Sequence, residues 1–220
     1  SGGFSKKNIS LSPTSIFYGK SVQKTNFVIT PIEVILTRIK RDNLRASIAA
    51  KVEIKKPSVL INNVGVLSEE KMAAYLLLHN PGLSNDKAKQ IVDYYVEEAK
   101  HEGINHDVAF SQMCLETGYL KYGGDVDPEQ NNFCGLGVVG GGVKGMSFKD
   151  VRSGVRAHIQ HLKAYANNDD LKFELIDERF HYVKRGCAPQ VNDLTGKWAT
   201  DKNYGNKISN ILSRLNEFKM

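Results

Sequence analysis

Apolar residues recur at helical spacing through most of the chain beyond Leu67. Ser68 followed by two glutamates is a typical helix start, MAAYLLL fills the helix, and Asn80-Pro81-Gly82 ends it. The spacing predicts a second helix over about residues 85–100, with Gly103 just beyond its end. Its apolar face consists of Ala88, Ile91, Val92 and Tyr95.

Three further helices are predicted in the same way. Asn105 is a suitable N-cap for HDVAFSQMCLE, whose apolar residues predict burial and whose last residue is Glu116. Residues 147–166 and 204–218 carry apolar positions at helical spacing. The segment 117–146, which follows Glu116 and precedes the helix over 147–166, shows no apolar periodicity. Loops of that length in compact domains are usually functional. The sequence therefore predicts a mainly α domain with one long functional loop.

The first 64 residues differ from the rest. NFVIT and EVILTRI are rich in β-branched residues, whereas Leu44, Ile48 and Val52 repeat every four residues, as in a short helix. We therefore expect a small mixed α/β or extended region over residues 1–64, followed by the helical domain over residues 65–220.

This N-terminal region also carries most of the positive charge. Residues 1–65 contain eleven Lys or Arg and three Asp or Glu, and the whole chain has a formal net charge of +6 at pH 7. A solvated basic face is the ordinary interpretation, and contact with an anionic cell surface through residues 1–64 is the functional one. The basic residues are not interleaved with aromatic ones, so we expect no nucleic-acid partner.

No apolar run is long enough for a transmembrane segment, and the N-terminus lacks a secretory signal core. Cys114, Cys134 and Cys187 cannot all pair, so we expect free thiols, with one disulfide as the alternative. No C-x-x-C or HExxH motif is present, even though His158 and His161 are one helical turn apart, so we expect neither a metal nor a cofactor. A cysteine nucleophile, Cys134 or Cys187 beside one of the six histidines, stays open.

GLGVVG, within residues 131–145, matches the G-x-G-x-x-G pattern of a dinucleotide-binding turn. That turn needs a buried strand before the glycines and a helix directly after them. The preceding DVDPEQNNFC is too polar for a buried strand, the next helix begins near Ser147, and Lys144 lacks the context of a phosphate-binding loop. We therefore interpret the glycines as tight turns or as points where the backbone approaches a ligand closely.

Glu116 is the leading candidate for a catalytic residue. The dipole at a helix C-terminus disfavours negative charge, and a helix built for burial withdraws water, so both effects favour the protonated carboxyl. A raised carboxyl pKa is what a general acid needs at neutral pH. The alternative interpretation is an exposed glutamate at the rim of the helix.

Four segments together resemble one enzyme family. FSQMCLETGYLKYGG, DPEQNNFCGLG, SFKDVRSGVRAHIQHLKAYA and WATDKNYGNKI are similar, in order and spacing, to motifs of bacterial peptidoglycan β-N-acetylglucosaminidases of the glycoside hydrolase family 73 type. The similarity runs from about Leu67 to Leu215. It implies a lysozyme-like fold, cleavage of the β-1,4 bond between N-acetylglucosamine and N-acetylmuramic acid, and Glu116 as the general acid.

The same resemblance implies a sugar-binding cleft. Asn131 and Asn132 correspond to the family's Asn-Asn signature, and Tyr204 corresponds to a tyrosine near the cleft. Other substrate-binding candidates are Gln112, Tyr119, Gly135 and Trp198. The expected partner is the glycan strand of peptidoglycan, which lies outside the cytoplasmic membrane, so we expect an extracytoplasmic location.

Glycoside hydrolysis ordinarily uses two carboxyl groups, and residues 131–149 contain none. The candidates for a second acid are Asp150, which also fits a capping box with Ser147, and Glu129, followed by Asp125 and Asp127. Without a second acid, the substrate's 2-acetamido group would act as nucleophile, or its C6 hydroxyl would release an anhydro product as in lytic transglycosylases. A non-catalytic peptidoglycan-binding module is the alternative from a different functional class.

Overall fold

The computed structural model describes residues 31–51 and 58–220. The chain divides into two compact units, Ser1–Ile54 and Lys55–Met220, and each is described by itself. Across the described residues the regular structure is helical, and no β-strand is present. No helix in this part of the chain has the length and apolar character needed to cross a membrane.

The first unit contributes α1, Pro31–Lys51. Pro31 occupies the first helical position, where the missing N–H costs no hydrogen bond and the fixed φ suits the helix. EVILTRI lies inside this helix, so its interpretation as a β-prone run is wrong. β-branched residues lower helix propensity only slightly, and the Leu, Arg, Lys and Ala residues around them are good helix formers. NFVIT and Val52 lie outside the described residues.

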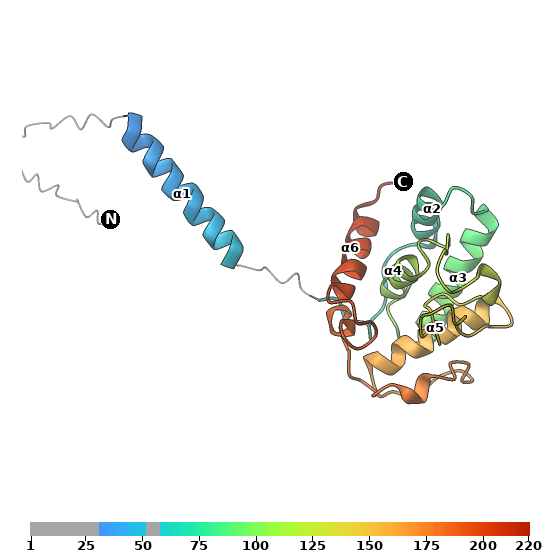
Figure 1. Ribbon diagram of the computed structural model, residues 1–220. Coiled ribbons are helices and arrows are strands. Elements are labelled where there is room, and N and C mark those ends of the chain that lie inside the picture. The colour runs from blue at the N-terminus through green and yellow to red at the C-terminus, as the bar shows by residue number, and fades with distance from the viewer. Residues whose placement is uncertain (1–30, 52–57) are drawn as a thin grey trace, which may run out of the picture. The chain divides into compact units, whose positions relative to one another are not determined.

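The second unit is a bundle of the five predicted helices (Figure 1). They are α2 (Glu69–His79), α3 (Asn85–Glu102), α4 (His106–Glu116), α5 (Val151–Ala166) and α6 (Tyr204–Glu217). Three short 3-10 helices join them: η1 (Pro128–Gln130), η2 (Phe180–Tyr182) and η3 (Val191–Leu194). The side chains of Ser68, Ser84 and Asn105 cap α2, α3 and α4, so the starts of these helices are set locally. The mainly α, lysozyme-like class expected from the sequence is confirmed.

α4 is the buried centre of this unit. All of its residues from His106 to Cys114 are buried, and it contacts α3, α5 and α6 (Figure 1). Phe110 and Met113 are fully enclosed in the main hydrophobic core, together with Tyr95 of α3. α4 is buried up to its last turn, and Glu116, its last residue, is exposed at the molecular surface.

The segment between residue 58 and α2 packs against the helical unit. Ile61 is fully buried in the same core, and its N–H donates to the carbonyl of Pro189 at 3.0 Å. Its carbonyl accepts the N–H of Asn105 at 2.8 Å. These bonds join the beginning of the unit to the start of α4 and to the C-terminal third of the unit.

The start of α5 corrects one detail of the sequence analysis. The capping box proposed for Ser147 and Asp150 is wrong, because Asp150 is itself the N-cap and its carboxylate accepts the N–H of Ser153 at 2.7 Å. The residues just before it stay in the loop, since the N–H of Phe148 donates to the carbonyl of Gln130 at 2.8 Å. The helix therefore begins four residues later than the periodicity suggested.

Candidate active site

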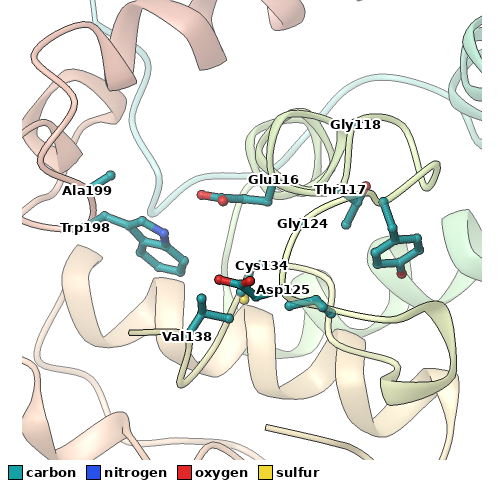
Figure 2. Close-up of a pocket in the computed structure, with 12 residues that line it drawn as sticks. Glu116, Thr117, Gly118, Gly124, Asp125, Cys134, Val138, Trp198 and Ala199 are labelled. Atoms are coloured by element: carbon teal, nitrogen blue, oxygen red, sulfur yellow. The ribbon is translucent and has the colours of Figure 1, made fainter. Parts of the chain in front are cut away.

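An open cleft of about 360 Å³ lies at the C-terminal end of α4 (Figure 2). Its lining comes from residues 116–126, from residues 134–138 and from Trp198 and Ala199. These segments are the end of α4 with the turn after it, the glycine-rich loop, and the approach to α6. The cleft is therefore built from three regions that the sequence keeps far apart.

The turn after α4 reverses the chain immediately beyond Glu116. Tyr119, Leu120 and Tyr122 have φ angles of 61°, 60° and 57°, a left-handed conformation that side chains with a Cβ rarely adopt. Thr117 fixes this turn, because its side-chain oxygen accepts the N–H of Leu120 at 2.8 Å and its carbonyl accepts the N–H of Tyr122 at 2.8 Å. Such strain costs on the order of 1–3 kcal/mol per residue and accumulates at functional sites. Here it returns the chain to the same cleft at Asp125.

The Glu116 carboxyl faces the open cleft on one side and Tyr204 on the other. Partial removal of water by the surrounding protein raises the pKa of Glu116. Hydrogen bonds from the Tyr204 hydroxyl and the Trp198 indole lower this pKa without cancelling the rise. Of the two causes expected from the sequence, desolvation and the helix dipole, desolvation is the main cause of the raised pKa of Glu116. The side chain is nevertheless open to the cleft.

A chain of buried hydrogen bonds ends at this carboxyl. The side-chain amide of Gln112 donates to the Tyr204 hydroxyl at 2.8 Å, and the Tyr204 hydroxyl donates to Glu116 Oε1. On the other side, His158 Nε2 lies 3.0 Å from Gln112 Oε1, and the Tyr95 hydroxyl lies 2.7 Å from His158 Nδ1.

The protonation state of His158 gives this chain its direction. Burial lowers the pKa of His158 to about 3, so the ring is neutral and carries one N–H. Gln112 Oε1 can only accept, so that N–H must be at Nε2, and Nδ1 accepts from the Tyr95 hydroxyl. Every donor then points toward Glu116. Because Tyr204 already accepts from Gln112, its own proton is free for the carboxyl.

Trp198 forms one wall of the cleft and is held from behind. Its ring centroid lies 4.9 Å from that of His161, in an edge-on contact, and 5.2 Å from that of Tyr165. The fully buried carboxylate of Asp177 contacts His161 Nδ1 at 2.7 Å and so fixes that ring. In Figure 2 the indole nitrogen of Trp198 lies on the side of the Glu116 carboxyl.

Asn131 and Asn132 organise the long loop and do not line the cleft. Asn132 is buried, its amide donates to the carbonyls of Leu136 and Met146 at 2.9 and 3.0 Å, and its oxygen accepts the N–H of Leu136 at 3.0 Å. Asn131 has a left-handed φ of 51° and donates to the carbonyl of Phe148 at 3.1 Å. The two asparagines thus tie the arms of the loop together at its base.

The glycine-rich segment is the projecting part of that loop. Gly135, Gly137 and Gly140 all have left-handed φ angles, as turns require. At Gly137 and Gly145 the two arms approach so closely that a Cβ would overlap Met146 or the carbonyl of Leu136. The G-x-G-x-x-G match is therefore a hairpin-like set of turns, of which Gly135 lines the cleft.

The predicted site residues separate into groups. Glu116, Gly135 and Trp198 line the cleft, and the buried Tyr204 contacts Glu116 from the protein side. Gln112 is fully buried and has no surface to offer a substrate. Tyr119 lies outside the cleft lining, where its ring stacks on His79 with centroids 4.2 Å apart.

The acids separate in a similar way. Asp150 caps α5 and lines a different pocket, and the hydrogen bonds from Ser153 lower its pKa. Glu129 is exposed on η1 and does not line the cleft. Asp125 does line it, and in Figure 2 the carboxyl groups of Asp125 and Glu116 both extend toward Trp198.

Sequence reasoning missed His158, which it weighed only as a metal ligand. A usable signal was present, since both Gln112 and His158 lie on helices with apolar surroundings, where a polar side chain needs a buried partner. The three cysteines are free, as expected. Burial raises the pKa of the Cys134 thiol well above its ordinary value, which keeps it protonated beside the cleft and makes it a poor nucleophile.

Comparisons with known proteins identify the family of this chain. Residues 92–217 match the model of the glucosaminidase family, described as mannosyl-glycoprotein endo-beta-N-acetylglucosaminidase. The chain is also similar to a protein of Borreliella burgdorferi described as an uncharacterized protein, with 42% identity over 171 residues, which cover 78% of this chain and 84% of the relative. The matched family region contains α4, the long loop, α5 and α6, together with the residues that line the cleft. The chain therefore belongs to the glucosaminidase family of glycoside hydrolases.

Proposed function

We propose that this protein cleaves the β-1,4 bond between N-acetylglucosamine and N-acetylmuramic acid in peptidoglycan, with Glu116 as the general acid. Family membership supports a peptidoglycan-degrading glycosidase. The observation that carries the assignment to Glu116 is a carboxyl with a raised pKa in an open cleft, bonded by both Tyr204 and Trp198. Since the substrate lies outside the cytoplasmic membrane, the enzyme would act there.

The chemistry follows from the two opposing influences on Glu116. Partial burial favours the protonated form, so a proton is available for the leaving oxygen at neutral pH. As this proton transfers, a carboxylate forms, and the hydrogen bonds from Tyr204 and Trp198 strengthen with its charge. Interactions that strengthen as the reaction proceeds lower its barrier, whereas those equally strong in the ground state do not.

We further propose Asp125 as the second carboxyl group. It is the other acid among the residues that line the cleft, and the strained turn after α4 holds the segment that carries it. Asp125 would activate a water molecule or stabilise positive charge on the sugar. If the substrate's acetamido group serves instead, Asp125→Asn should change the rate less than tenfold. A loss of about a hundredfold or more would assign the role to Asp125.

The deciding experiment is mass spectrometry of fragments released from purified peptidoglycan. The chains to compare are wild type, Glu116→Gln and Glu129→Gln, the last as a matched control on the exposed η1. We expect reducing-end N-acetylglucosamine from wild type and the control, and a rate at least about 10²–10⁴-fold lower for Glu116→Gln.

The other outcomes would replace the proposal. Anhydro ends would assign the chain to lytic transglycosylases. Full turnover by Glu116→Gln would remove Glu116 as the acid. If no chain releases fragments while all bind the polymer, the protein is a binding module.

A further inference from the structure

A second, basic pocket lies behind the Trp198 wall. Its volume is about 660 Å³, and its lining includes Tyr165, Tyr182, Lys184, Arg185, Cys187 and Lys197. Three of these carry positive charge, and none of the residues lining the pocket is acidic. The nearby Asp177 is fully buried, its carboxylate contacts His161, and it forms no ion pair with these three cations.

The cations are partly pre-organised. Arg185 donates to the carbonyls of Asn167 and Asp169 at 3.2 and 2.7 Å, and its guanidinium lies 4.4 Å from the ring centroid of Phe180. The ammonium group of Lys197 donates to the carbonyl of Cys187. All these partners are backbone carbonyls or an aromatic ring, and within the described residues neither cation forms an ion pair.

Lys184 is the most available of the three. Its side chain is exposed, and within the described part of the chain it has no acidic partner. The two tyrosines, half-buried Tyr165 and exposed Tyr182, add flat surfaces beside the charges. Cations held next to aromatic rings, with no carboxylate of their own, are suited to bind an anion with an organic body.

The pocket and the catalytic cleft share a wall. Lys197 lines the pocket and the next residue, Trp198, lines the cleft. Tyr165 also lines the pocket, and its ring lies 5.2 Å from that of Trp198. A branched polymer that lies against Trp198 on the cleft side would therefore have a substituent close to the basic pocket.

We propose that the basic pocket binds a carboxylate of the peptide that branches from the glycan strand. This inference rests on the proposed function, because peptidoglycan supplies the ligand. N-acetylglucosamine is neutral, and the carboxyl group of N-acetylmuramic acid is taken up in the amide bond wherever a peptide is attached, so such sugars offer no anion to three cations. The peptide on each N-acetylmuramic acid carries free carboxylates, and it branches beside the bond that Glu116 would cleave. The pocket would then determine which peptide-bearing sugars are held next to the cleft.

The test uses the full chain carrying Glu116→Gln, so that binding is measured without turnover. Lys184→Glu reverses one charge in the pocket, and Lys89→Glu makes the same change on an exposed face of α3 as a control. The probes are peptidoglycan freed of phosphate polymers, and the same material after its peptide carboxyl groups have been amidated. Binding is measured by co-sedimentation over a range of polymer concentrations.

We expect Lys184→Glu to bind the untreated polymer about three- to tenfold more weakly than the control, the range of one or two partly exposed charge pairs. Amidation should weaken the control by a similar factor and weaken Lys184→Glu less, because only Arg185 and Lys197 remain there to bind a carboxylate. Equal binding by the two variants on untreated polymer would overturn the proposal. So would a loss of the same size that persists on the amidated polymer.

Failure of the proposed function would look different. The chain with Glu116 intact would release no reducing ends from either material. The binding difference between Lys184→Glu and Lys89→Glu is measured separately, and it reports on the pocket alone.

Discussion

Removing a single oxygen atom tests the chain of hydrogen bonds at Glu116. Tyr204→Phe keeps the ring that packs in the core and deletes the hydroxyl that donates to Glu116 and accepts from Gln112. Two effects should follow, one on catalysis and one on stability. They arise from different partners of the same hydroxyl, so they can be measured independently.

The catalytic effect follows from the charge that develops on Glu116. A hydrogen bond to a charged group contributes about 1.5–3 kcal/mol, which corresponds to about a 10- to 150-fold decrease in kcat if it is expressed fully in the transition state. The bond from Tyr204 lowers the pKa of Glu116, so its loss should raise that pKa further. A general acid works in its protonated form. The alkaline limb of kcat against pH should therefore move to higher pH in Tyr204→Phe.

The stability effect comes from Gln112. Its amide is fully buried and would lose its acceptor, which costs about 1–3 kcal/mol in the free energy of unfolding. Urea unfolding measures this cost, and kcat on soluble peptidoglycan fragments between pH 4 and 9 measures the first effect. Tyr94→Phe, at a partly buried tyrosine of α3 outside the cleft lining, serves as the control. An alkaline limb that stays in place or moves to lower pH in Tyr204→Phe would refute the proposed role of the hydroxyl.

Three further predictions follow from the same geometry. His158→Phe removes the partner that orients the Gln112 amide, so it should move the alkaline limb of kcat to higher pH, as Tyr204→Phe does. It should also lower the free energy of unfolding by about 1–3 kcal/mol. An unchanged pH profile would limit His158 to a structural role. Folding raises the pKa of Glu116 above its ordinary 4.5, so wild type should lose stability as the pH rises from below 4.5 through the raised value. Glu116→Gln should then be more stable than wild type at neutral pH and no more stable at pH 3.5, and thermal unfolding at both pH values decides. Gly154→Ala places a methyl group on the carbonyl of Asn131 and should cost at least about 1–3 kcal/mol in urea unfolding, whereas Gly82→Ala, with nothing nearer than 3.6 Å, should be close to neutral.

The sequence was most informative where the physical cause is local. Helix caps, apolar stripes and glycine stops act over a few residues, so all five helices of the second unit could be predicted. The long loop was recognisable because it lacks such a period. EVILTRI shows the limit of this approach. Its residue types favour a strand, but the helix-forming residues around it carry it into α1.

The arrangement of the candidate site was not predictable in the same way. Glu116 and Tyr204 are 88 positions apart, and Gln112 and His158 are 46 apart, so only the packed fold brings them together. The second acid illustrates this further. The sequence offers Asp150, Glu129, Asp125 and Asp127 as candidates, and only the fold shows that Asp150 caps a helix whereas Asp125 lines the cleft.

Glu116 stands where the buried helix α4 meets an open cleft. On one side α4 is buried along nearly its whole length, and a directed hydrogen-bond chain reaches the carboxyl from Tyr95. On the other side the carboxyl faces an open cleft of about 360 Å³. Left-handed residues directly after Glu116 would be unfavourable in an isolated peptide, and the well-packed core of α4 offsets their cost. A catalytic carboxyl must be held within a fraction of an ångström while its substrate stays mobile, and a rigid helix that ends at the cleft surface meets both requirements.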